Sequence, residues 1–160
     1  MKLNTMRCKE CRREMGLSLI STLAGEESGL RIRIDDMPAM ACAEGHRRFI
    51  APDFAVKLME SLFKDDSLVP VERAAMKGIL RKHCVCPACG NALDPDQAGT
   101  AEAKRVLELG TSKAFGVTLV MPKYCCASCG KESVPPDVWL GNAFMKASAR
   151  AFQAANVAPA

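Results

Sequence analysis

Two short cysteine motifs carry the chemistry that this sequence makes available. CPACG occupies residues 86–90 and CASCG occupies residues 126–130. Two cysteines separated by two residues can direct both sulfur atoms toward one point, and the following glycine admits the left-handed backbone of such a turn. Together the pairs supply the four thiolates that a tetrahedral zinc ion binds, with room for a hairpin between them. We therefore predict a zinc site formed by Cys86, Cys89, Cys126 and Cys129.

A second candidate site lies in the N-terminal part of the chain. Cys8 and Cys11 form another pair with a two-residue gap, and Cys42-Ala-Glu-Gly-His46 follows further along. Zinc accepts three sulfur ligands and one nitrogen ligand, so His46 could replace the fourth thiolate. In the alternative interpretation, His46 is a surface histidine beside two arginines and Cys42 is merely buried. We predict a second zinc site formed by Cys8, Cys11, Cys42 and His46.

The cellular compartment decides how the nine cysteines are interpreted. Charged side chains interrupt residues 1–20, which excludes the apolar core of a signal peptide. The longest apolar run, residues 115–122, is too short to cross a bilayer. We therefore expect a cytoplasmic protein, in which thiols stay reduced and paired cysteines indicate metal rather than disulfides. The odd number of cysteines also argues against a complete disulfide framework.

The two halves of the chain are similar when the sequence is shifted by 84 positions without a gap. The matching pairs are Met37-Pro38 with Met121-Pro122, Cys42-Ala43 with Cys126-Ala127, and Pro52-Asp53 with Pro136-Asp137. In each copy a strand-like stretch, residues 30–34 or 116–121, leads into the second cysteine motif and then into a helix. The first motifs are offset by 78, so the intervening loop is longer in the second copy. We predict an α+β fold of two small zinc-ribbon modules in tandem, each followed by an α-helix.

Three helices are expected around these modules. The first begins at Pro52 or Asp53 and ends near Lys64, because Pro and Asp favour a helix start and apolar residues recur at helical spacing. A second helix links the halves within residues 67–83, and a long third helix occupies residues 137–156. The expected parts are an N-terminal module (1–66), the linking helix (67–83) and a C-terminal module (84–160). Such small modules rarely bury a secure core, so we expect metal and fold to be lost together.

The residues that carry the repeat also resemble a known family. They are Met6-Arg7-Cys8-Lys9-Glu10-Cys11, Met37-Pro38-Ala39-Met40-Ala41-Cys42 and Ile50-Ala51-Pro52-Asp53. Their order is similar to that of the YgiT-type zinc finger, the N-terminal domain of MqsA-like antitoxins. The resemblance covers roughly residues 7–63 and more loosely residues 86–145. It implies zinc ligation by Cys8, Cys11, Cys42, Cys86, Cys89, Cys126 and Cys129.

Two departures from the family pattern limit what the resemblance implies. The family's last ligand is normally a cysteine three positions after its partner, where this chain has Gly45 and then His46. In MqsA-like antitoxins a helix-turn-helix domain that reads operator DNA follows the zinc domain, whereas here a second zinc ribbon is expected. The resemblance therefore implies contact with a protein, as the zinc domain of that family makes, and does not imply DNA reading by a helix-turn-helix.

The last helix suggests a further contact. Between Val138 and Ala160 the only charged residues are Lys146 and Arg150, and no residue is acidic. A helix so poor in charge either buries more than one face within its own chain or meets another chain. Packing within the chain and formation of a homodimer through this helix both remain open at this point.

Net charge gives little support to nucleic-acid binding. The formal value of +4 falls to about +1 when both sites hold zinc, because bound thiolates outweigh the metal charge. Arg31 and Arg33 share one face of a predicted strand, and we expect them to lie near Arg47 and Arg48. These four arginines form a candidate nucleic-acid site, and a solvated ribbon face is the simpler alternative.

No catalytic residue is predicted. A catalytic zinc keeps one position open for water, whereas each site here can be filled by four protein ligands. His83, Cys84 and Cys125 remain without an assigned role. We predict a non-enzymatic bacterial protein with two structural zinc ions that acts as an antitoxin-like or adaptor module in protein–protein interaction and regulation. The alternative is a zinc-ribbon protein that binds DNA or RNA through its Arg-rich N-terminal ribbon.

Overall fold

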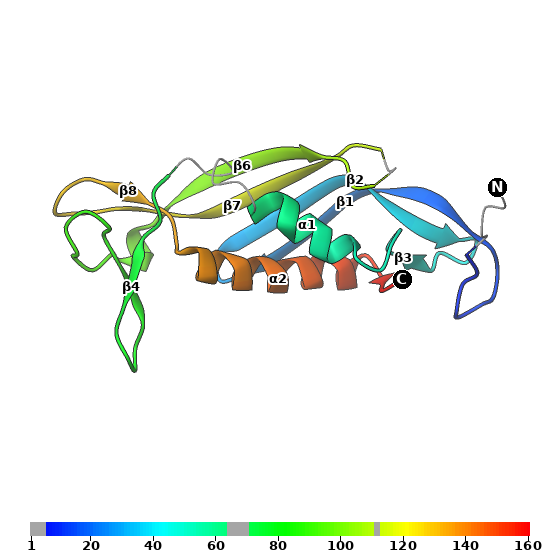
Figure 1. Ribbon diagram of the computed structural model, residues 1–160, viewed down its shortest axis with the longest axis horizontal. Coiled ribbons are helices and arrows are strands. Elements are labelled where there is room, and N and C mark those ends of the chain that lie inside the picture. Colours follow the sequence, from blue (N-terminus) through cyan, green and yellow to red (C-terminus); the bar gives the residue numbers. More distant parts are fainter. Residues whose placement is uncertain (1–5, 64–70, 111–112) are drawn as a thin grey trace.

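A sheet built from both halves of the chain forms the centre of the computed structural model (Figure 1). The structure describes residues 6–63, 71–110 and 113–160, and in these residues the sheet has seven strands. The first hairpin consists of β1 (Met15–Glu27) and β2 (Leu30–Cys42). The second consists of β6 (Gly99–Leu107) and β7 (Phe115–Cys125). Because β2 pairs antiparallel with β7, the two hairpins form one continuous layer in the order β1-β2-β7-β6.

Alternation of apolar and polar residues produces the two faces of this layer. Ile32 and Ile34 of β2 are buried opposite Leu119 and Val117 of β7. The intervening positions of β2 are exposed on the other face of the sheet. The alternation is interrupted at Asp36, whose backbone is left-handed (φ 59°), and Met37 and Ala39 beyond it are buried in the same core. Residues on both sides of Asp36 therefore contribute to one core.

Short strands extend each end of the sheet. β3 (Arg47–Arg48) pairs with the end of β2, and β9 (Val157–Ala158) runs parallel to β3. β8 (Glu132–Ser133) pairs with the end of β7 in the same manner. The segment that follows the C-terminal helix thus returns to the end of the sheet where β3 pairs with the last residues of β2.

Two α-helices cover one face of the sheet (Figure 1). The first, α1 (Phe54–Phe63), confirms the expected helix, with Phe54, Leu58 and Leu62 buried. Lys64, its expected last residue, lies outside the described residues. The second, α2 (Asp137–Ala154), confirms the long C-terminal helix and packs chiefly on β1 and β2 of the other half. The main hydrophobic cluster therefore draws on both halves of the chain.

The prediction of a linking helix within residues 67–83 is wrong for the described residues 71–83. This segment contains β4 (Ala75–Lys77), which pairs with β5 (His83–Val85) in a separate hairpin. The local reason is Gly78, whose left-handed backbone (φ 107°) closes a tight turn against the carbonyl of Arg81. Tertiary pairing adds to it, because Ala74 donates its backbone N–H to Val134 across 2.8 Å. A short 3₁₀ helix, η2 (Pro95–Gln97), precedes β6.

The molecule is elongated, and its two cysteine groups lie at opposite ends (Figure 1). The first group flanks the β1–β2 hairpin, and the second flanks the β6–β7 hairpin. The architecture is α+β, as expected, and is mostly strand. Among the described helices, none combines the length and apolar character needed to span a bilayer.

Candidate metal centres

The second cysteine group has the geometry of a four-sulfur metal site. The Sγ atoms of Cys86 and Cys129 lie 3.6 Å apart, and those of Cys89 and Cys126 lie 3.5 Å apart. All four sulfur atoms lie within 4.8 Å of one another. Sulfur atoms at the corners of a zinc tetrahedron are about 3.8 Å apart, given a Zn–S bond of about 2.3 Å. The four thiols therefore fit around one metal ion, and they are too far apart for disulfide bonds.

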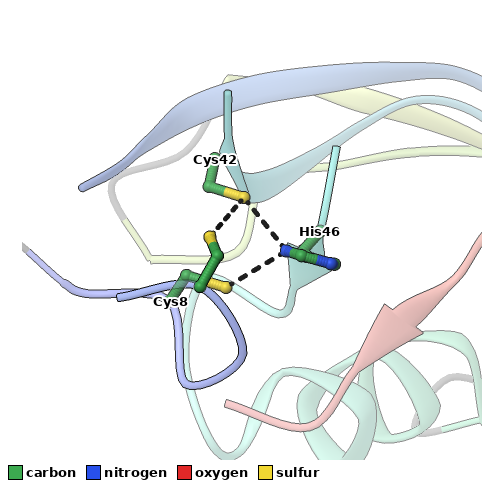
Figure 2. Close-up of side chains that lie close together, drawn as sticks. Cys8, Cys42 and His46 are labelled. Carbon is green, nitrogen blue, oxygen red and sulfur yellow. Dashed lines mark hydrogen bonds between the residues drawn. The ribbon is translucent and has the colours of Figure 1, made fainter. Parts of the chain in front are cut away.

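The first group brings three sulfur atoms and one nitrogen together (Figure 2). His46 directs Nδ1 toward Cys8 and Cys42, at 3.5 Å and 3.4 Å from their sulfur atoms. The sulfur of Cys11 lies 3.6 Å from that of Cys42. These ligand atoms also lie within 4.8 Å of one another. The alternative of an unrelated surface histidine does not fit this convergence, because one ring nitrogen faces both thiols.

All three cysteine pairs with a two-residue gap lie in the same kind of backbone turn. Cys8 donates its N–H to the carbonyl of Arg13, and Cys86 donates to Asn91 in the equivalent bond. Cys126 donates likewise to Lys131. A residue with a left-handed backbone follows each pair: Arg12 (φ 60°), Gly90 (φ 76°) and Gly130 (φ 74°). The turn folds the chain back on itself, which directs both sulfur atoms of each pair to the same side.

The turn at Cys42 is one residue shorter. Gly45 (φ 84°) occupies the position that holds the second cysteine elsewhere, and the Cys42 N–H bonds to the carbonyl of His46. The chain then enters β3 directly. The longer imidazole side chain of His46 reaches the sulfur atoms from the position just before β3. The shorter turn and the histidine therefore compensate for each other.

Backbone amides make two thiols in each group more acidic. Hydrogen bonds from the N–H groups of Cys11 and Glu10 lower the pKa of Cys8 to about 7, against the effect of burial. The N–H of Cys129 similarly lowers the pKa of Cys126 to about 6. For Cys129 the effect of a backbone N–H is outweighed by neighbouring thiols and burial, which raise its pKa to about 12. The pKa is also lowered for Cys42 and Cys86 and raised for Cys11 and Cys89. A cation that replaces the thiol protons would remove the repulsion that keeps the second thiols protonated.

Glu10 is a functional candidate that the sequence-based prediction did not include. Its Oε2 lies 3.0 Å from Nε2 of His46, on the side of the ring opposite the three sulfur atoms. Contact with Cys42 and the charge of Glu10 both raise the pKa of His46, against burial. A metal-binding histidine commonly donates its other N–H to a carboxylate, which fixes the tautomer that binds the metal. The signal that could have revealed Glu10 was this pairing rule, applied to the acidic residue inside the first cysteine pair.

Replacement of Glu10 by glutamine is expected to weaken metal binding at the first site by about 10- to 100-fold. The amide keeps the size of the side chain but removes the negative charge that orients the His46 ring. Competition with a coloured chelator, read site by site, measures the change. Glu44→Gln is the matched control, because Glu44 pairs with Arg13 at 2.6 Å, whereas the ion pair of His46 within the described residues is with Glu10. Equal affinities for the E10Q variant and the wild type would contradict the assigned role.

Arg12 is strained where Gly90 and Gly130 are not. A left-handed backbone costs a residue with a side chain roughly 1 kcal/mol relative to glycine. Arg12→Gly is therefore expected to raise the free energy of unfolding by up to about 1 kcal/mol. The reciprocal change, Gly130→Ala, is expected to lower it by a similar amount, although nothing lies within 4 Å of the added methyl group. Urea denaturation of the metal-bound protein compares the variants; a stabilised G130A variant would refute the assignment.

The four candidate nucleic-acid arginines do not form one surface. Arg31 and Arg33 lie beside β7, whereas Arg47 and Arg48 lie at the opposite end of β2, about 25 Å away along the strand. Arg48 is only 7% exposed, and Arg47 donates to the carbonyl of Ala155. The expectation that the pairs lie close together is wrong, because β2 continues for several residues beyond Arg33 before it turns.

The remaining cysteines lie outside both metal groups. Cys84 is half-buried, and its sulfur is 3.6 Å from Sδ of Met76. Burial raises the pKa of Cys84 and also raises that of the neighbouring Tyr124 to about 12. Cys125 is exposed and faces the carbonyl of Gly130. His83 is exposed on β5. None of these three residues belongs to either cluster of metal-ligand atoms in the described chain.

Fold and sites together define an α+β protein with two groups of cysteine and histidine side chains, each of which could hold a metal ion. No protein-family model, curated protein or solved structure matches the chain. The resemblance to the YgiT-type zinc finger therefore remains a prediction from the sequence.

Proposed function

We propose that the chain is a protein with two structural zinc ions and no catalytic activity. The observation that carries this proposal is the presence of two closed sets of four ligand atoms, with nearest separations of 3.4–3.6 Å. Thiolates and imidazole are the ligands that zinc prefers, and four thiolates or three thiolates with one histidine are typical of structural sites. A four-ligand set leaves a tetrahedral zinc ion no open position for water, which supports a structural role.

We further propose that the two halves are copies of one zinc-ribbon unit. An isolated bridge pairs Arg7 with Glu14 in the first half, and an equivalent bridge pairs Val85 with Ala92 in the second. Both sets of residues differ by the same 78 positions as the first cysteine pairs. Equivalent bridges at equivalent positions support duplication more strongly than the matching letters do.

Strand pairing also locates the differences between the copies. Ile34 and Thr118 differ by 84, but their hairpin partners Leu23 and Lys104 differ by 81. The additional length of the second copy is thus divided between the segment that contains η2 and the hairpin loop, rather than confined to that loop. At β3 and β8 the offset becomes 85, because the turn at Cys42 is one residue shorter. An alignment of the two copies therefore needs a one-residue gap at this turn. The offset returns to 84 at Pro52 and Pro136, so the gap is compensated within a few residues.

The proposed role is that of an antitoxin-like or adaptor module that binds another protein. Two metal-stabilised ends connected by a shared sheet form a rigid elongated body, which supports this role. A homodimer through α2 also stays a proposal: the apolar stripe of the helix packs inside the chain, but Val138 (78%) and Met145 (49%) remain exposed.

Native mass spectrometry of protein purified gently from its own host tests the proposed function. We expect a mass that includes two zinc ions together with a second polypeptide. Cobalt substitution should give the visible spectrum of tetrahedral sulfur coordination at both sites. One metal ion or none, or cobalt spectra without tetrahedral character, would refute the two-site proposal. A complete two-zinc monomer without any partner would refute only the interaction role.

Nucleic-acid binding remains the second candidate because of one feature of the uncovered sheet face. Arg31, Arg33 and Lys104 line a shallow groove there, although Asp35 and Glu102 also line it. Arg33 pairs with Asp35 and Lys104 pairs with Glu102, which reduces the free positive charge. Binding of an oligonucleotide that weakens steeply with salt and is lost in an R31S/R33S variant would support this candidate.

A further inference from the structure

The β4–β5 hairpin ends in two apolar side chains that the protein leaves in solvent. Ile79 is 97% exposed and Leu80 is 98% exposed, the highest values among the large hydrophobic residues of the described chain. The hairpin projects from the body on the side of the sheet that carries the helices (Figure 1). Burial of two such residues releases free energy, so their full exposure at a projecting tip indicates a contact outside this chain.

The charges around the tip have one sign. Lys77 precedes the turn and Arg81 and Lys82 follow it, whereas residues 75–85 contain no Asp or Glu. None of the ion pairs within residues 6–63, 71–110 and 113–160 involves these three cations. Arg81 and Lys82 are exposed, so their charge is available to an external anionic group, whereas the ammonium group of Lys77 lies beside Gly90 at the second metal group. The apolar residues occupy the apex and the cations are set back along both strands.

We propose that this hairpin tip binds an anionic lipid surface. The order of side chains from the apex, aliphatic and then cationic, matches the order of layers in a bilayer, where acyl chains lie beneath phosphate groups. A projecting hairpin can reach a flat surface without interference from the body. Binding to such a surface does not require a groove or cleft. The tip combines the two contributions that reversible membrane association requires, apolar insertion and electrostatic attraction.

The turn fixes the two aliphatic side chains at the apex. Gly78 has a left-handed backbone, and an added Cβ there would overlap the carbonyl of Arg81. The base of the hairpin is held by the pairing of Ala75 with Val85, next to the second metal group. The apex is therefore presented by a defined structure whose orientation depends on the adjacent metal site.

Sedimentation with vesicles tests the proposal on the intact metal-loaded protein. The expected result is binding to vesicles of phosphatidylserine and phosphatidylcholine in equal parts, and little binding to phosphatidylcholine alone. An I79S/L80S variant should bind about a hundredfold more weakly, because two aliphatic insertions are lost. An R81S/K82S variant should bind roughly thirtyfold more weakly, with a smaller dependence on salt. All four positions are exposed, so the fold and the metal content should not change.

Two control variants separate the tip from general surface effects. Val106→Ser removes an aliphatic side chain that is 76% exposed on β6, and K113S/K146S removes two exposed cations far from the hairpin in sequence. Both should bind like the wild type. The proposal is overturned if the wild type does not bind anionic vesicles, or if the I79S/L80S variant binds them equally well. Tip-dependent binding to a DNA duplex without any vesicle binding would also overturn it, and would identify the tip as an apolar wedge between bases.

Discussion

Removal of both metal ions by a strong chelator is expected to lower the melting temperature by on the order of 20 °C. A structural zinc site contributes about 10 kcal/mol or more in apparent binding free energy. Only part of this free energy is lost from the stability of the central sheet, because the ends can unfold locally. Differential scanning calorimetry of the loaded and stripped protein measures the change. Zinc added back should restore the transition.

The unfolding should be unequal along the chain. Both metal groups belong to small buried clusters at the ends, separate from the main cluster beneath the helices. Backbone amides around Cys42 and Cys126 should lose their protection from hydrogen exchange in the stripped protein. Amides in the β2–β7 pairing should keep most of theirs. Uniform loss of protection would show that the central sheet cannot persist without metal.

Gly25→Ala is expected to destabilise the protein by about 3 kcal/mol, the upper part of the range for overpacked cores. Gly25 lies on β1 directly beneath α2. An added Cβ would overlap the carbonyl of Ala147 and lie 2.9 Å from the backbone nitrogen of Ala151. Because both contacts are backbone atoms of a helix, the whole of α2 must move away from the sheet. Thermal denaturation should show a melting temperature about 10 °C lower.

Gly16→Ala is the matched control for this prediction. Gly16 lies on the same strand, and nothing lies within 4 Å of the added methyl group. The variant should be as stable as the wild type or up to about 1 kcal/mol more stable, because alanine loses less backbone entropy on folding. A G25A variant with unchanged stability would show that α2 is not held against β1 as closely as the structure indicates.

The candidate metal ligands were predictable because their geometry is local. A two-residue gap between cysteines constrains both sulfur atoms within a single turn, so Cys86 and Cys89 could be assigned without knowledge of the fold. His46 was predictable for the same reason, from its spacing to Cys42. Glu10 was missed because its role depends on which ring nitrogen faces the sulfur atoms, and that follows from the path of the shorter turn.

The pairing of the halves was not predictable because it depends on contacts between distant segments. The sequence indicated two small modules, each dependent on its own metal. The antiparallel pairing of β2 with β7 instead joins both halves in one sheet. The linking segment shows the same limitation: Ala74 and Ile79 fit a helical stripe, but pairing with Val134 and the turn at Gly78 hold the segment in extended strands.

The parallel pairing of β3 with β9 has a consequence for synthesis on the ribosome. A nascent chain emerges from its N-terminal end, so β3 leaves the ribosome long before Val157 and Ala158, which hydrogen-bond beside it. The apolar face of β1 and β2 likewise waits for α2, which is made near the other end of the sequence. The first half therefore emerges with an incomplete core, and chaperones that bind exposed aliphatic segments are expected to engage it until the second half follows.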